Sequence, residues 1–141
     1  MAFDQAKADI ICQRLAEGES LRAICRDDGM PAESTVRLWA LNDVNGFSAQ
    51  YTRARELGYH ALADEIIYIS NTPERGVKTK IGDDGKVETT EGDMIEHRRL
   101  KVDSRKWYLS KMLPKIYGDK LDLNHSGYIA TPREMSEDDL E

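Results

Sequence analysis

The residues with the clearest chemistry stand at the start of a short predicted helix, about residues 33–42. Its first turn carries two small hydroxyl side chains, Ser34 and Thr35, followed by Arg37. Short polar side chains let a helix N-terminus approach phosphates and base edges, and the free N–H groups of the first turn attract an anion. Arginine can donate a bidentate pair of hydrogen bonds to guanine. The pattern predicts a DNA-binding helix, and we include Arg22 from the preceding segment in the predicted contact set.

A second group of charged side chains lies on a helix predicted over about residues 93–113, which begins at Asp93 and stops before Pro114. Its polar surface is mostly basic: Arg98, Arg99, Lys101, Arg105, Lys106 and Lys111 lie there, together with the acid Asp103. Two interpretations stay open. The bases either form a solvated face with salt bridges to acids such as Asp64, Glu65 or Asp103, or they line a surface that faces a polyanion, as in a ring around DNA.

The same helix carries two apolar stripes. Ile95, Val102 and Leu109 recur every seven residues, and Leu100 and Trp107 form the second stripe. Two stripes on one helix indicate two packing partners. One partner can be another helix of the chain, and the other can be a neighbouring subunit.

No pattern in the chain is typical of a catalytic or metal site. The sequence has no Gly-rich phosphate loop, no HExxH and no GxSxG motif, and the paired acids Asp83 and Asp84 fall in a predicted turn. Cys12 and Cys25 lie in helical patterns, without a histidine at ligand spacing, and are interpreted as buried reduced thiols. We therefore expect no enzymatic activity, no metal and no cofactor.

The predicted DNA-binding helix is positioned by two shorter helical segments before it. Residues 4–17 place apolar side chains on one helical face, Gly18 stops this helix, and Ser20 can cap a second short helix that ends at Gly29. Three short helices with a glycine-containing turn describe a helix-turn-helix domain. A plain three-helix bundle that binds nothing has the same periodicity, so that alternative stays open.

The basic helix is expected to pack on a long helix that runs from Phe47 to Asn71, with Pro73 just beyond its end. A helix of this length spans nearly 40 Å, which is too long for a small monomer to bury by itself. Between the two helices, the segments VKTKI and KVETT flank GDDG, which predicts a β-hairpin over residues 76–91 that projects into solvent or onto a partner. A flexible loop is the alternative.

Length and composition argue against a membrane-spanning or secreted protein, and the charge is unevenly distributed. The chain has 141 residues and a net charge of −6, and it lacks an apolar run long enough to cross a membrane. No signal pattern opens it, so a cytoplasmic product is expected. The charge is uneven: residues 94–120 carry eight bases and three acids, whereas residues 121–141 carry one base and six acids. The acidic C-terminal tail is expected to be disordered, and the −6 is mostly a property of this tail.

Two blocks of the sequence resemble the small terminase subunits of tailed double-stranded DNA phages. The first block is GESLRAICRDDGMPAESTVRLW, residues 18–39. The second block, LKVDSRKWYLSKMLPKIYGDK over residues 100–120, is more specific. With the helical stretch between them, the resemblance covers about residues 8–120.

The resemblance implies a mainly all-α fold with three parts. Residues 1–45 would form the helix-turn-helix domain, and residues 46–120 a helical hairpin for oligomerisation that carries the β-hairpin. Residues 121–141 would contain a short strand, 121–130, before the acidic tail. Asp103, Arg105, Lys106 and Trp107 fall in the ring-forming helix, where the first three would make polar contacts within or between subunits.

The resemblance also implies a role and partners. Such a subunit forms a homo-oligomeric ring of about 8–11 copies, binds the packaging-initiation site on double-stranded viral DNA, and delivers it to the large terminase subunit in the host cytoplasm. It regulates that ATPase and nuclease and is not itself an enzyme. Family members commonly carry a basic residue directly before the tryptophan; this position is Leu38 here, so the base-reading side chain stays open.

Two functions from other classes remain as alternatives. One is a dimeric helix-turn-helix transcriptional regulator or transposition accessory protein, and the other is a scaffold without a DNA role. Oligomeric mass separates a dimer from a ring.

Overall fold

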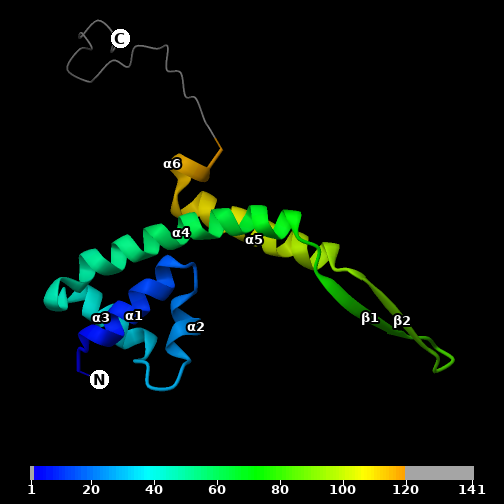
Figure 1. Cartoon of the computed structure of the whole chain (residues 1–141), viewed down its shortest axis with the longest axis horizontal. Coiled ribbons are helices and arrows are strands. Elements are labelled where there is room, and N and C mark those ends of the chain that lie inside the picture. The colour runs from blue at the N-terminus through cyan, green and yellow to red at the C-terminus, as the bar shows by residue number, and fades with distance from the viewer. Residues whose placement is uncertain (1, 120–141) are drawn as a thin grey trace, which may run out of the picture.

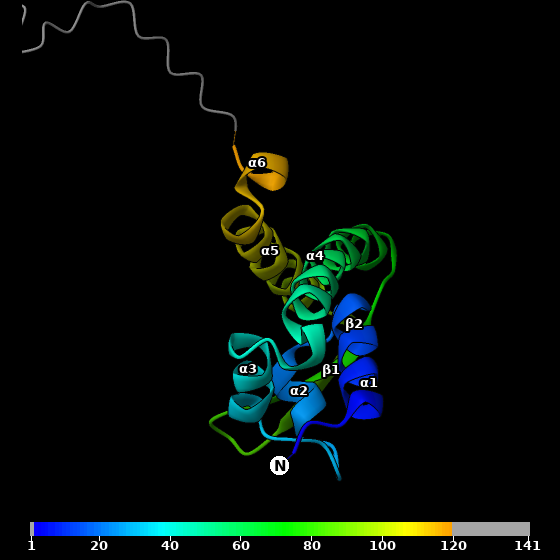
Figure 2. The ribbon, with the colours of Figure 1, turned by 90° about the vertical axis from the view of Figure 1, so that its left-hand side faces the viewer.

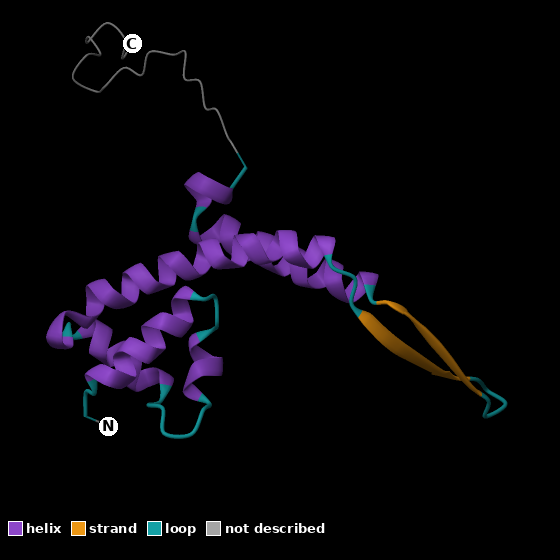
Figure 3. Cartoon of the chain, viewed as in Figure 1, coloured by secondary structure: helices purple, strands orange, loops and turns teal. Residues whose placement is uncertain are grey.

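The computed structural model describes residues 2–119, and this part of the chain is mainly helical, as predicted (Figure 3). The elements are α1 (Gln5–Ala16), α2 (Leu21–Cys25), α3 (Glu33–Leu41), the short 3-10 helix η1 (Val44–Gly46), α4 (Phe47–Asn71), β1 (Arg75–Ile81), β2 (Val87–Asp93), α5 (Ile95–Met112) and α6 (Pro114–Tyr117). No helix among residues 2–119 combines the length and apolar character that crossing a bilayer requires. The predicted strand 121–130 and the acidic tail lie outside the described residues.

The molecule is elongated, with three kinds of structure along its length (Figure 1). The bundle of α1, α2 and α3 lies against the first half of α4, and α5 runs back along the second half of α4. The two-stranded ribbon projects beyond the far end of this α4–α5 hairpin. The perpendicular view shows α4 between the N-terminal bundle and α5 (Figure 2).

The N-terminal bundle begins and turns where the sequence indicates. The Asp4 side chain accepts hydrogen bonds from the first-turn amides of α1, and the Ser20 hydroxyl accepts one from the Ala23 amide, 3.2 Å away, as the capping pattern predicts. Gly18 and Gly29 adopt positive φ angles of 96° and 80°, so they make the turns that separate α1, α2 and α3.

Arg14 connects the two turns of the bundle. Its guanidinium donates to Glu19 at 2.7 Å and also to Asp27, which lies between α2 and α3. These two carboxylates hold the pKa of Arg14 above its usual value. The contacts therefore join the end of α1 to the turns on either side of α2 with charged side chains at the surface.

The core of the bundle includes the beginning of α4. The Trp39 ring packs edge-on against Phe3 and Phe47, with ring centroids 4.9 and 5.9 Å away. Phe47 is completely buried, although the sequence division places residues 1–45 in one unit and residues 46–120 in the next. α4 is thus shared by both parts of the structure.

The two cysteines lie in this bundle. Cys12 is buried, as predicted, and Cys25 is half-buried. Burial raises the pKa of the Cys12 thiol to about 11, because the thiolate would lose its hydration there.

The second half of α4 packs on α5. Tyr59 and Tyr108 meet edge-on with centroids 5.6 Å apart, and Ile69 and Leu109 are buried. After α5, Pro114 starts α6, and the Tyr117 hydroxyl lies 2.8 Å from His60 Nδ1 on α4. The helical hairpin predicted from the apolar stripes is therefore present, with α6 attached to its side.

The β-hairpin is longer than predicted. Its register pairs Arg75 with Asp93 and Ile81 with Val87, around a turn in which Gly85 has a φ of +77°. Asp93 was expected to begin the last helix, but it is the final residue of β2, and its carboxylate accepts a hydrogen bond from the Glu74 amide at 2.9 Å. α5 starts two residues later for this reason.

Gly58 allows the bundle to approach α4 closely. A Cβ at this position would lie 2.2 Å from the Leu15 carbonyl oxygen and 3.2 Å from the Leu15 carbonyl carbon. Real Cβ atoms do not approach a backbone oxygen this closely, so any side chain here would push α1 away from α4. Only glycine fits at this crossing.

We expect Gly58→Ala to lower the free energy of unfolding by about 1–3 kcal/mol, because overpacking at the crossing outweighs the better helix propensity of alanine. Urea denaturation at fixed protein concentration measures the effect. Gly92→Ala is the matched control, since a Cβ at Gly92 has no neighbour within 4 Å. Equal stabilities of the two variants would contradict the close packing at Gly58.

Candidate nucleic-acid interface and assembly surfaces

The predicted DNA-contacting residues lie on α2 and on the outer face of α3. Val36 and Trp39 bury the inner face of α3, so its 3.6-residue period turns Ser34 and Arg37 toward solvent. Arg22 on α2 is also exposed, whereas Thr35 is half-buried. The structure brings Arg22 and Arg37 to the same surface, because both side chains reach the first residue of α3.

That first residue is Glu33, which the sequence interpretation did not include. One Glu33 carboxylate oxygen lies 3.6 Å from Arg22 Nε, and the other lies 3.8 Å from Arg37 Nη2. The spacing of Glu33 and Arg37, four residues apart on one helix, was the signal that could have found this pair. The contact with Arg22 depends on the crossing of α2 and α3 and has no such signal.

The start of α3 has no side-chain cap. Ala32 occupies the N-cap position and makes no side-chain hydrogen bond to the first-turn amides. The amides and the helix dipole therefore favour a negative group at this end, and Glu33 is the acid that the first turn supplies.

The outer face of α3 also carries two exposed leucines. Leu38 is 53% exposed and Leu41 is 79% exposed. The surface that surrounds Arg37 is thus apolar as well as charged.

The basic residues of α5 divide into two groups, and the first group is used within the fold. Arg98 donates to the carbonyl oxygens of Ile69 at 2.8 Å and Ser70 at 2.9 Å, at the C-terminus of α4, and also to the Asp93 carboxylate. A cation at this end of a helix interacts favourably with its dipole and with carbonyls that lack helical partners. Arg98 therefore connects α4, β2 and α5.

Lys101 and Arg105 continue this group. Lys101 Nζ lies 3.0 Å from the Glu74 carboxylate, and this hydrogen bond holds the pKa of Glu74 below its usual value. Arg105 Nε lies 3.2 Å from Glu65, and Arg105 also donates to the Lys101 carbonyl oxygen. The salt bridge to Glu65 is one of the alternatives that the sequence left open for these bases.

The second group of charged residues on α5 makes no such contacts in the part of the chain that the structure describes. Within residues 2–119, this group makes no ion pair or side-chain hydrogen bond, and it consists of Arg99, Asp103, Lys106 and Lys111. These side chains are exposed. They are charged residues of α5 that are available to a partner.

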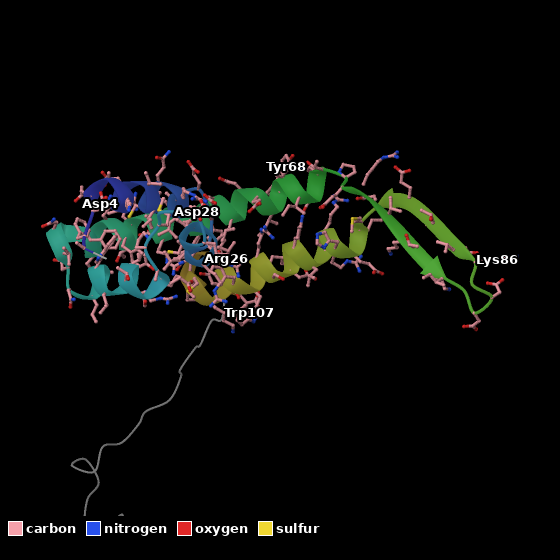
Figure 4. The ribbon with its side chains drawn as sticks, turned by 90° about the horizontal axis from the view of Figure 1, so that it is seen from below. Asp4, Arg26, Asp28, Tyr68, Lys86 and Trp107 are labelled. Atoms are coloured by element: carbon pink, nitrogen blue, oxygen red, sulfur yellow. The ribbon has the colours of Figure 1, made fainter. Side chains whose placement is uncertain are left out.

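Trp107 and Tyr68 mark opposite sides of the α4–α5 hairpin (Figure 4). Trp107, which is 64% exposed, lies on one side, next to a groove of about 370 Å³ whose lining includes Ala63 and Ile66 of α4. Tyr68, which is 67% exposed, lies on the other side, where a groove of about 320 Å³ is lined by Arg98 and Arg105 among others. The Tyr68 groove is therefore lined by more charged side chains than the Trp107 groove, in which, among the described residues, only Lys106 and Asp119 are charged.

Comparison with known proteins assigns the chain to one family. Residues 3–124 match the model of the family described as bacteriophage Sf6, terminase small subunit-like. The chain belongs to this family. The matched span contains the bundle of α1, α2 and α3, the α4–α5 hairpin and the ribbon, so membership in the terminase small subunit-like family applies to nearly all of the described structure.

Solved structures of this terminase small subunit family have a similar fold. They include three single-substitution variants of the terminase small subunit gp1 of the bacterial virus Sf6. Each is 31% identical to this chain, with a TM-score of 0.63, and the alignment covers 90% of this chain and 85% of that chain. A search of curated proteins gave no match.

Substitution of Arg98 and of its neighbour Arg99 separates the two groups of bases. We expect Arg98→Ala to lower the free energy of unfolding by about 1–3 kcal/mol, because two α4 carbonyls lose a charged donor. We expect Arg99→Ala to change it by less than about 0.5 kcal/mol, because its exposed side chain has no partner in the described part of the chain. Chemical denaturation gives both values, and equal losses would contradict the division.

Proposed function

We propose that this chain is a phage terminase small subunit that acts in the host cytoplasm as a homo-oligomeric ring of about 8–11 copies. The ring recognises the packaging-initiation site on double-stranded viral DNA, delivers the DNA to the large terminase subunit, and regulates its ATPase and nuclease activities. The small subunit makes and breaks no covalent bond. The observation that carries the proposal is the family match, because it covers the helix-turn-helix bundle and the α4–α5 hairpin together.

The surface of the hairpin supports assembly. A ring requires a heterologous interface, in which one surface of a subunit binds a different surface of its neighbour. The α4–α5 hairpin offers two dissimilar sides, marked by Trp107 and Tyr68 (Figure 4). Large apolar side chains on α4 and α5 are exposed in the single chain: Ile67, Tyr68, Ile95, Leu100, Trp107 and Met112. Burying them against a neighbour would stabilise the ring.

The charge of the α2–α3 segment supports binding by many copies together. Residues 21–41 carry three arginines and three acids, so this segment is neutral. Because neutralisation of phosphates supplies most non-specific affinity, one copy should bind duplex DNA weakly. A ring that presents several copies raises the effective concentration of the second and later contacts.

Trp107→Ala tests the ring. We expect this variant to shift the protein to smaller species, because the exposed indole supplies a large apolar area to the proposed interface. Native mass spectrometry measures the subunit number. Leu41→Ala, which removes an exposed leucine from α3 instead, should leave the ring intact. If the unsubstituted protein is a dimer by the same measurement, the alternative function of a dimeric helix-turn-helix regulator is supported instead.

Arg37→Ala tests the DNA surface. We expect it to weaken binding to duplex DNA about tenfold while the subunit number stays unchanged, because it removes an exposed cation from the proposed recognition helix. Gel-shift titration at fixed salt measures the affinity. Arg53→Ala is the control, since Arg53 is an exposed arginine on α4 in an ion pair of similar length. Unchanged affinity in both variants would exclude α3 as the DNA-contacting helix.

A further inference from the structure

We infer that Glu33 restrains non-specific DNA binding by occupying the two arginines that would otherwise contact phosphate. This inference rests on the proposed contact between α3 and DNA. It adds a residue whose negative charge opposes binding, and it assigns that residue a role in specificity.

The geometry places one carboxylate between two cations from different helices. Glu33 Oε2 lies 3.6 Å from Arg22 Nε on α2, and Glu33 Oε1 lies 3.8 Å from Arg37 Nη2 on α3. The Glu33 side chain is 26% exposed, whereas the arginine side chains are 72% and 59% exposed. The acid is thus the more enclosed member, and the arginines surround it at the surface.

The Cys25 thiol lies close enough to be affected by the charges of Glu33 and Arg37. Burial is the main cause of the raised pKa of the Cys25 thiol, but Glu33 raises it further and Arg37 lowers it. Cys25 is the last residue of α2. The charges of Glu33 and Arg37 therefore meet at the crossing of α2 and α3, where the contact with Arg22 is also made.

The position of Glu33 determines what incoming DNA meets. It is the first residue of α3, at the helix end whose amides and dipole would favour a phosphate. The carboxylate already supplies a negative charge there. A phosphate that approaches α3 must therefore compete with Glu33 for Arg22 and Arg37, and it is also repelled by Glu33 itself.

This competition favours specific over non-specific contacts. A non-specific complex gains mainly from phosphate neutralisation, and Glu33 reduces that gain for every duplex equally. A cognate site supplies further hydrogen bonds to base edges, and a carboxylate in the major groove can accept one from the N4 amino group of cytosine. Loss of the carboxylate should therefore strengthen binding to unrelated DNA most.

The test uses Glu33→Gln in the full-length assembled protein, with a random-sequence duplex as the probe. Fluorescence anisotropy over a series of salt concentrations measures the affinity. We expect Glu33→Gln to bind the random duplex about three- to tenfold more tightly than the unsubstituted protein, which corresponds to the loss of two exposed ion pairs. The gain should shrink as the salt concentration rises.

Two control variants define the effect. Glu56→Gln removes the same charge from a pair that Glu56 makes with Arg53 at 3.8 Å on α4, and it should leave the affinity unchanged. Glu33→Asp keeps the negative charge and should bind like the unsubstituted protein. An equal gain in Glu33→Gln and Glu56→Gln would show a general effect of net charge and would overturn the inference. The inference would also be overturned if Glu33→Asp bound the random duplex as tightly as Glu33→Gln does.

Arginine variants separate the inference from the proposed function. If Arg37→Ala weakens binding but Glu33→Gln does not strengthen it, α3 binds DNA and the role of Glu33 is wrong. If neither substitution changes the affinity, the proposed DNA surface is wrong. In an Arg22→Ala, Arg37→Ala background, Glu33→Gln should give a smaller gain than it gives alone, because the carboxylate then has no arginine to occupy.

Discussion

The close approach of the Leu15 backbone to Gly58 connects the two parts of this molecule. At this crossing α1 lies against α4 without an intervening side chain, and Gly18 at the end of α1 packs near Ala61 and Leu62 of the same helix. α4 therefore cannot be assigned to one part alone. Its first half completes the aromatic core of the N-terminal bundle through Phe47, and its second half packs on α5 through Ile69. Because one continuous helix packs on both the bundle and α5, it connects the surface proposed to bind DNA to the surface proposed to assemble.

Charged residues in this family member serve the fold as well as its surfaces. Arg98 satisfies carbonyl groups at the C-terminus of α4, and Arg14 joins the turns on either side of α2. At the start of α3, Glu33 lies between two arginines. In each case one charged side chain connects two or three elements. A count of bases along the chain therefore overstates the positive charge that is available to DNA, because an arginine that is already paired must exchange its partner for a phosphate.

The charged side chains that connect elements of the fold have partners within the chain, whereas many large apolar side chains of the α4–α5 hairpin do not. Buried polar side chains without partners are absent from the described residues, yet Trp107, Leu100 and Ile67 are more than half exposed. Buried polar groups are satisfied within one chain, whereas large apolar side chains remain exposed. This imbalance is typical of a subunit whose remaining burial comes from association, since exposed apolar patches mark interfaces.

The sequence by itself determined the elements and the family. The cap at Ser20, the turn glycines, the 25-residue α4 and the hairpin turn around Asp84 and Gly85 all follow from local chemistry, which acts over a few residues and can therefore be predicted from the order of residues. The specific block at residues 100–120 indicated the terminase small subunit, and the family match agrees. Only the tertiary structure decided which charges pair. Arg98 with the end of α4, Lys101 with Glu74, and Arg22 with Glu33 join residues from separate elements, so no spacing along the chain predicts them. The physical reason is that an ion pair depends on distance in space, which is set here by the packing of α4 against both the bundle and α5.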